Sequence, residues 1–287
     1  MSGFDVHQHL WPRAFSEALA QRETAPFLDG DTLYLREGAY PLELGDHELE
    51  ARLRLLDRAE IGTAIVSLQP TLGLEALVAD ERERLEGIWE DGILELAAAA
   101  GGRIAPLAVG RPRAGFAGVS VGADRLDDLA SLAASLDGLR GSGFLFVHPI
   151  SGSQPPGAPT WWPALVDYTS QMQRAYLAWL AHGQARWPDV NVVFAILAGG
   201  GPIQLERLSS RGVDVDATLH RNLFFDTASY GPRALRLCVE ALGVAQLVFG
   251  TDVPVVDPAH AVHALGELGE SVERLVREEN PLRLFAG

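Results

Sequence analysis

The feature that most constrains the fold is the repeated alternation of short apolar runs with stretches of helical periodicity. Eight runs rich in β-branched or aromatic residues have the composition and length of buried strands. They lie at residues 4–10, 63–69, 104–110, 118–124, 143–150, 191–197, 223–229 and 247–255. Helical patterns separate most of these runs, although the connection at residues 111–117 is too short for a full helix. Repeated βα units of this kind predict a parallel sheet.

Eight strands with intervening helices in 287 residues favour a fold of the α/β class, a closed (β/α)8 TIM barrel, over an open doubly wound sheet. No glycine-rich nucleotide-binding motif follows the first run, which also argues against the open sheet. We expect a single domain over residues 1–287. The segment 21–46 is an insertion after the first strand that contains a candidate hairpin with Gly38 at its turn. Because it follows the carboxyl end of a strand, it should lie at the mouth of the barrel like a lid.

The charge of the chain restricts its partners. Its 38 acidic and 23 basic residues give a net charge of −15, which repels nucleic-acid phosphates and anionic lipids. We therefore expect a small-molecule substrate and neither a nucleic-acid nor a membrane partner. The one cysteine, Cys238, excludes a disulfide framework and a cysteine-based metal cluster.

Two further expectations concern location and assembly. The sequence has no basic leader and no apolar run of the ~18 residues that a membrane span needs, so we expect a cytoplasmic protein. A long helical pattern contains Met172, Tyr176 and Trp179. Its apolar face could pack on the barrel or on a second copy, which leaves a homodimer open.

Two histidines stand one residue apart in the first run, "FDVHQHLWP". Side chains alternate along a strand, so His7 and His9 point to one face with Cα atoms about 6–7 Å apart. Two neutral imidazoles on one face can bind a single divalent cation, and imidazole suits zinc and its first-row neighbours. A pair of structural histidines with hydrogen-bonded partners is the alternative.

Two more candidate ligands occur at the ends of later runs. His148 ends the fifth run in "FLFVHPI", and Asp252 ends the eighth in "LVFGTDVPV". In a closed barrel the first and eighth strands are neighbours, while the fifth faces them across the mouth. Three histidines and an aspartate would then converge on one divalent metal ion.

Several motifs in this order resemble the amidohydrolase superfamily, in the branch that contains aminocarboxymuconate-semialdehyde decarboxylase. They are "DVHQHLWP", "LFVHP", "FAILAGGGPIQLERL", "FFDTAS" and "LVFGTDVP", and they span nearly the whole chain. The resemblance implies a distorted (β/α)8 barrel and one divalent metal ion, usually zinc. It also implies that the ligands are His7, His9, His148 and Asp252.

The chain departs from that branch at one position. Where the related decarboxylases have a histidine that serves as acid and base, this sequence has Ala198, which cannot move a proton. His47 and His260 follow strands on the catalytic side of a barrel and could substitute for it, although surface histidines are the alternative.

The leading hypothesis is therefore a metal-dependent hydrolase. Asp252 would bind the metal and accept a proton from a metal-activated water that attacks a lactone, ester or amide carbonyl. The alternative is a non-oxidative decarboxylase of an aromatic or enol carboxylate. A non-catalytic binding or accessory protein is a third interpretation.

Four residues are candidates for substrate binding. Trp11 and Arg13 follow the histidine pair, and an arginine there could pair with a substrate carboxylate. Trp161 lies in the loop after the fifth run and could form a wall of the pocket. Asp226 ends the seventh run, where it could contact substrate, orient a metal ligand or cap backbone donors.

Overall fold

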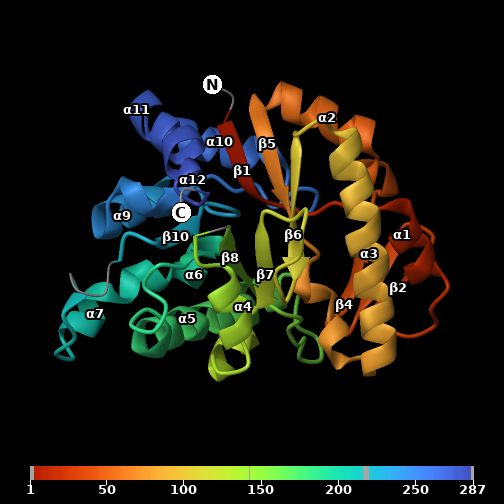
Figure 1. Ribbon diagram of the computed structural model, residues 1–287, viewed down its shortest axis with the longest axis horizontal. Helices are drawn as coiled ribbons and strands as arrows, with labels where there is room; N and C mark the ends of the chain where they lie inside the picture. The colour runs from red at the N-terminus through yellow and green to blue at the C-terminus, as the bar shows by residue number, and fades with distance from the viewer. Residues whose placement is uncertain (1–2, 142, 216–219, 286–287) are drawn as a thin grey trace.

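Eight parallel strands form the centre of the protein (Figure 1), seen in a computed structural model that describes residues 3–141, 143–215 and 220–285. In sheet order the strands are β1 Gly3–Gln8, β5 Ile61–Val66, β6 Ile104–Val109, β7 Gly118–Gly122, β8 Phe144–His148, β9 Asn191–Phe194, β10 Leu223–Asp226 and β11 Leu247–Val248. All eight predicted strands are confirmed. Most end before the predicted run does, because the residues at the carboxyl ends leave the ladder to form the mouth of the barrel.

The sheet closes where β1 meets the segment that follows β11. The Val6 amide donates to the Phe249 carbonyl at 2.8 Å, and the Asp252 amide donates to the His7 carbonyl at 2.8 Å. Gln8 forms a parallel bridge with Val253. These bonds join the first and last strands, so the fold is the predicted (β/α)8 TIM barrel.

Helices surround the sheet (Figure 1). They are α1 Arg13–Ala20, α2 Leu49–Arg58, α3 Ala79–Ala99, α4 Ala133–Gly138, α5 Tyr168–Ala178, α6 Ile196–Gly200, α7 Leu205–Ser209, α9 Pro232–Leu242, α10 Pro258–Gly266, α11 Glu270–Arg274 and α12 Asn280–Leu282. Residues 111–117 contain no helix, as predicted from the length of that connection. None of the helices in the described ranges has the length and apolar character of a membrane span.

The apolar face of α5 packs on the barrel. Met172, Tyr176 and Trp179 are all at most 1% exposed, so this face is covered within the chain. This face is therefore not available to a second copy. A homodimer stays a prediction, but the apolar face of α5 does not support it.

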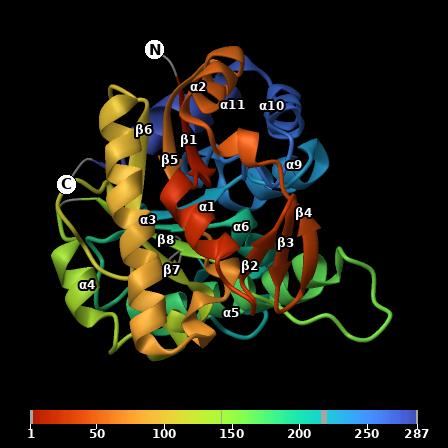
Figure 2. The same cartoon turned by 90° about the vertical axis from the view of Figure 1, so that its right-hand side faces the viewer.

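The inserted segment folds as a small antiparallel sheet beside α1 (Figure 2). Its strands are β2 Phe27–Asp29, β3 Thr32–Leu35 and β4 Gly38–Pro41. The predicted hairpin is β3–β4, closed by the pair Leu35–Gly38, while the three-residue β2 is too short for its pattern to be recognised.

The tip of the hairpin contacts the loop after β8. Glu37 is 2% exposed, and its carboxylate accepts hydrogen bonds from the Gly152 amide and the Tyr168 hydroxyl. The Ser151 hydroxyl also donates to it, at 3.3 Å. The hairpin tip is therefore fixed to the β8–α5 connection, and whether the segment acts as a lid stays a prediction.

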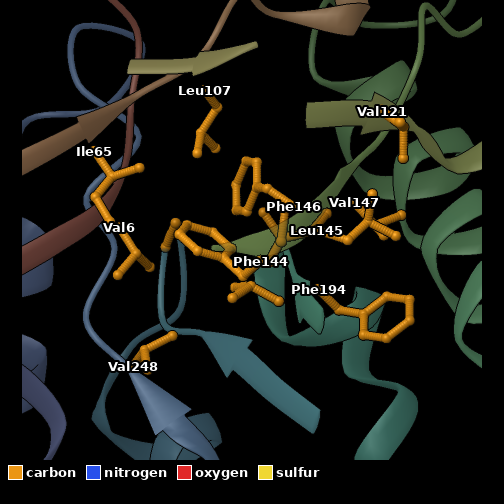
Figure 3. Packing of buried hydrophobic residues seen from close by; sticks show 14 of the residues in the cluster. Val6, Ile65, Leu107, Val121, Phe144, Leu145, Phe146, Val147, Phe194 and Val248 are labelled. Atoms are coloured by element: carbon orange, nitrogen blue, oxygen red, sulfur yellow. The ribbon is translucent and has the colours of Figure 1, made fainter. Parts of the chain in front are cut away.

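Apolar side chains fill the lower part of the barrel. Ile65, Leu107, Phe144 and Phe146 point into the space between the strands (Figure 3) and are completely buried. The Phe146 ring meets the His7 ring edge to face, with centroids 5.1 Å apart. The apolar core thus ends where the polar mouth begins, and it forms the floor of the histidine cluster.

Candidate metal centre

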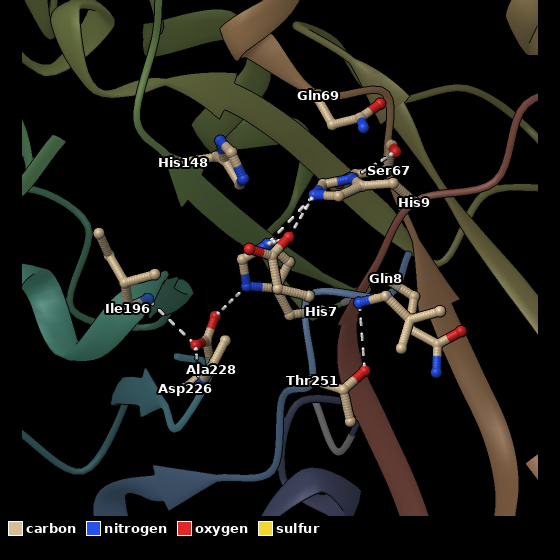
Figure 4. A network of polar contacts seen from close by, with 12 residues as sticks. His7, Gln8, His9, Ser67, Gln69, His148, Ile196, Asp226, Ala228 and Thr251 are labelled. Atoms are coloured by element: carbon tan, nitrogen blue, oxygen red, sulfur yellow. Dashed lines mark hydrogen bonds and ion pairs between the residues drawn. The ribbon is translucent and has the colours of Figure 1, made fainter. Parts of the chain in front are cut away.

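The four predicted ligands converge at the carboxyl ends of the strands. One nitrogen or oxygen from each of His7, His9, His148 and Asp252 lies within 4.8 Å of the others. The three histidines are at most 5% exposed and their rings surround a common point (Figure 4). Asp252 Oδ1 lies 3.4 Å from His7 Nε2 and 3.2 Å from His9 Nε2. Strand closure brings these side chains together, as the sequence predicts.

Each imidazole has its Nδ1 atom bound to an oxygen of the protein. The acceptors are Asp226 Oδ2 for His7 at 2.9 Å, the Ser67 carbonyl for His9 at 3.0 Å and the Pro149 carbonyl for His148 at 2.8 Å. Carbonyl and carboxylate oxygens accept, so Nδ1 carries a proton in each ring, and in the neutral imidazole Nε2 then presents a lone pair to the cluster. Metal-binding histidines have this same pattern of outer hydrogen bonds.

The unshared electron pairs at the centre favour a cation. The Nε2 atoms of His7 and His9 are 3.3 Å apart, so either a proton on one of them or a cation between them must separate their lone pairs. Three imidazole nitrogens and one carboxylate oxygen are the donor set that zinc and neighbouring divalent ions prefer. The residues present therefore fit one divalent metal ion.

The charges of the cluster agree with that fit. Burial lowers the pKa of His148 and of His9, which favours the neutral imidazoles that a metal requires. Burial alone would raise the pKa of Asp252, but the neighbouring histidines lower it by more. The net shift is downward, so this carboxyl is ionised. Burial also opposes a charge on His7, yet Asp226 and Asp252 raise its pKa to about 9. The two carboxylates thus favour a cation at this position.

Asp226 orients His7. It is completely buried, and its second oxygen accepts hydrogen bonds from the Ile196 amide at 3.0 Å and the Ala228 amide at 2.9 Å. Both carboxylate oxygens are engaged by the chain (Figure 4), which favours the orienting and capping roles over substrate contact.

Sequence reasoning missed two buried charges beneath the cluster. Asp5 accepts hydrogen bonds from the His7 amide, from Gln8 and from Thr251, whose hydroxyl lies at 2.6 Å. Arg52 donates to Gln8 and to the His9 carbonyl, both at 2.9 Å. Strand alternation could have found Asp5, which shares a face with His7; Arg52 comes from a distant helix and leaves no such signal.

The remaining predicted contacts lie in different surroundings. Trp11 is 1% exposed, and its indole N–H donates to Gln69 Oε1 at 2.6 Å. The Arg13 side chain is 87% exposed and pairs with Glu17 on the surface of α1, outside the buried cluster. Trp161 is 55% exposed and stacks on Trp162. The roles proposed for these residues in substrate binding stay predictions.

The two candidate substitutes for the missing imidazole lie in different surroundings. His47 stacks on Trp11, and its Nδ1 accepts the Trp11 amide at 3.0 Å. Burial and nearby Arg52 lower the pKa of His47 to about 3, so it is neutral at physiological pH. His260 is exposed on α10.

Ala198 lies in a left-handed turn just after β9. Ile196, Leu197 and Ala198 have φ angles of 47°, 49° and 49°, a region that costs non-glycine residues roughly 1–3 kcal/mol each. The turn directs the Ile196 amide to Asp226. The strained turn thus helps to hold the Asp226 carboxylate that orients His7. The buried Ala198 methyl group supplies no proton.

A model of the amidohydrolase family matches residues 4–287. The chain belongs to the amidohydrolase family. Among curated proteins, none matches it significantly.

Solved structures similar to this amidohydrolase include a protein named IDCase and two decarboxylases. IDCase from Metarhizium anisopliae has 19% identity and a TM-score of 0.81, with 99% of this chain and 96% of that chain covered. The 5-carboxyvanillate decarboxylase LigW from Sphingomonas paucimobilis has 18% identity and a TM-score of 0.75, with 99% and 98% covered. Dihydroxybenzoic acid decarboxylase from Polaromonas sp. JS666, with bound manganese and 2-nitroresorcinol, has 15% identity and a TM-score of 0.68, with 99% and 96% covered. At these identities the likeness establishes the fold of this amidohydrolase and nothing further.

Proposed function

We propose that this amidohydrolase is a metal-dependent, non-oxidative decarboxylase of an aromatic or enol carboxylate. The observation that carries the proposal is the buried cluster of three imidazoles and Asp252, each imidazole held by an outer hydrogen bond. The decarboxylases among the similar solved structures support this reaction over the hydrolysis that the sequence favoured first. Hydrolysis is the competing reaction that the experiment described below distinguishes from decarboxylation.

We propose a single divalent ion of the first transition row as the cofactor. The donor set suits zinc, which the sequence predicted, and the similar Polaromonas decarboxylase contains manganese. When bound, the ion would act as a Lewis acid on the carboxylate of the substrate and a neighbouring oxygen. His7, His9, His148 and Asp252 would hold it.

Asp252 is the group proposed to move the proton. The three imidazoles have both nitrogens committed, to an outer acceptor and to the centre, and Ala198 has no proton to give. Asp252 is ionised, and its side chain is 15% exposed. It would accept the hydroxyl proton of the substrate and return it to the carbon that bears the carboxylate. The C–C bond then breaks, its electron pair stays with the ring, CO2 leaves, and solvent reprotonates the oxygen.

The test measures CO2 release from a panel of 2-hydroxybenzoates by zinc- or manganese-loaded protein. CO2 release is expected from the wild type, with a loss of about 10²–10⁴ in kcat for Asp252→Asn, because general acid–base catalysis contributes that much. Hydrolysis of lactones without CO2 release from any carboxylate would contradict the proposal and restore the first hypothesis.

A further inference from the structure

A cavity of about 200 Å³ lies beside the metal centre, at the carboxyl ends of β5, β6 and β7. Two of its lining residues connect it to the histidines. Gly122 pairs in register with His148, and Gln69 follows Ser67, whose carbonyl holds His9. Figure 4 shows Gln69 next to His9. The cavity therefore adjoins the segments that carry His148 and hold His9, although none of the four candidate ligands is among its lining residues.

Ser120 forms part of the buried lining. It is 3% exposed and pairs in register with Phe146, whose ring lies against His7, so its side chain shares the interior face. Its hydroxyl has no hydrogen-bond partner among the residues that the structure describes. An unsatisfied buried hydroxyl costs roughly 1–3 kcal/mol, and a ligand group in the cavity would remove that cost.

Gln69 presents a donor to the same space. It is 7% exposed, and its Oε1 accepts the indole N–H of Trp11. Because an indole nitrogen only donates, this bond fixes the orientation of the amide and leaves the Nε2 hydrogens for another acceptor. The buried part of the cavity thus contains one hydroxyl and one amide donor.

The rim of the cavity carries more acid than base. Its charged residues are Glu75, Arg82, Glu86, Asp124 and Arg125. Arg82 lies 3.9 Å from Glu86, so the charges of these two side chains partly neutralise each other. Burial raises the pKa of Glu75, with Asp124 adding to it, so the environment there already disfavours negative charge. A second carboxylate on a substrate would meet this acidic rim.

We propose that this cavity selects a one-ring monocarboxylate with an uncharged hydroxyl or carbonyl oxygen on its far side, and disfavours a dicarboxylate. This oxygen accepts a hydrogen bond from Gln69 Nε2 and forms another hydrogen bond with the Ser120 hydroxyl. The volume lies below the roughly 300–1,000 Å³ of clefts that take drug-sized ligands, which limits the occupant to a small ring. The inference rests on the proposed function, because the metal centre must hold the carboxylate.

The test is calorimetric titration of the metal-loaded protein at a pH near 7, which measures binding without turnover. Probes are 2-hydroxybenzoate and its analogues with either a hydroxyl or a second carboxylate at ring position 4 or 5. At one of these positions the hydroxyl analogue should bind about tenfold more tightly than the carboxylate analogue, a difference of roughly 1.4 kcal/mol.

Two variants separate recognition from folding. Ser120→Ala should weaken the hydroxyl analogue about two- to tenfold, leave 2-hydroxybenzoate unchanged and not lower the melting temperature, because no bond within the protein is lost. Gln69→Glu keeps the acceptor for Trp11, removes the amide donor and should also weaken the hydroxyl analogue. The matched control is Ser135→Ala: this serine donates to the Gly110 carbonyl at 2.8 Å, so its loss should lower stability and retain the preference.

The outcomes distinguish the two proposals. If 2-hydroxybenzoate binds but the hydroxyl and carboxylate analogues bind equally, or Ser120→Ala retains the full preference, the cavity proposal is wrong and the metal centre stands. If no probe binds while the metal is retained, the proposed function is wrong and the cavity proposal with it. Selective binding without CO2 release would support the cavity and contradict decarboxylation.

Discussion

The buried cation Arg277 at the amino end of the barrel and the buried histidines at the carboxyl end have different kinds of partner. At the amino end, Arg277 lies against the start of β1, 7% exposed, with its guanidinium over the Phe249 ring. One of its nitrogens pairs with Glu273 at 3.0 Å, and another donates to the Ala59 and Glu60 carbonyls. At the carboxyl end, three imidazoles direct their Nε2 atoms at a common centre, where they lie among one another and the Asp252 carboxylate.

This difference separates residues that hold the fold from residues that await a ligand. Buried polar groups in native proteins are nearly always paired, so a satisfied cation such as Arg277 needs no function beyond stability. The histidine cluster, the unpartnered Ser120 hydroxyl and the left-handed turn at Ala198 all lie at the other end. In TIM barrels this is also the end that carries catalysis.

The largest expected effect comes from removing a ligand at the carboxyl end. His148→Ala should lower activity roughly 10³-fold or more, since the Lewis-acid contribution of the metal is worth several kcal/mol. The measurement is the rate of CO2 release at saturating metal. The control is His260→Ala, an exposed histidine whose loss should leave the rate unchanged. Equal rates for both variants would remove His148 from the centre.

A smaller effect is expected from loosening the support of a ligand. Asp226→Asn keeps the size of the side chain but weakens the hydrogen bond to His7 Nδ1. Loss of such an outer partner typically lowers metal affinity about 10–100-fold, so the metal dissociation constant should rise by that factor. Competition with a chelator of known affinity measures it, and an unchanged constant would show that His7 does not depend on Asp226.

At the amino end, the same kind of change should affect stability alone. Arg277→Met leaves the Ala59 and Glu60 carbonyls without their hydrogen-bond donor and should lower the free energy of unfolding by roughly 1–3 kcal/mol. Metal content and CO2 release per folded chain should not change. A fall in metal affinity without a fall in stability would contradict the claim that Arg277 contributes to stability alone.

The last prediction concerns pH. His47 has a pKa of about 3 in the folded chain and about 6.5 when unfolded, so between these values the unfolded state binds the extra proton. Stability from this group is complete above pH 6.5 and falls as pH decreases, by at most about 1.4 kcal/mol per pH unit. His47→Gln, which can still accept the Trp11 amide, should flatten the unfolding free energy between pH 6.5 and 4. Parallel curves for the variant and the wild type would contradict the low pKa.

Local pattern was enough to predict the strands and the convergence of the four candidate ligands. The eight apolar runs were readable because buried parallel strands are continuous and short, and the candidate ligands were readable because they lie at or near the carboxyl ends of runs. Barrel closure then brings together residues as distant as His7 and Asp252 without further information.

Side-chain contacts between segments far apart in the sequence could not be predicted. Nothing near Glu37 in the sequence indicates that its carboxylate binds Gly152 and Tyr168, and nothing near Arg52 points to the His9 carbonyl. The surroundings of Arg13 could not be predicted either: it follows the histidine pair closely in sequence, but the chain enters α1 at Arg13 and its side chain faces solvent, where it pairs with Glu17.

The central claim is that the four converging side chains bind one divalent ion. The most direct measurement is metal content by mass spectrometry after reconstitution with zinc or manganese and removal of free metal, with a His7→Ala, His9→Ala double variant beside the wild type. About one ion per chain in the wild type and none in the variant is the predicted result. Wild-type protein that retains no metal, or a variant that retains as much as the wild type, would contradict it.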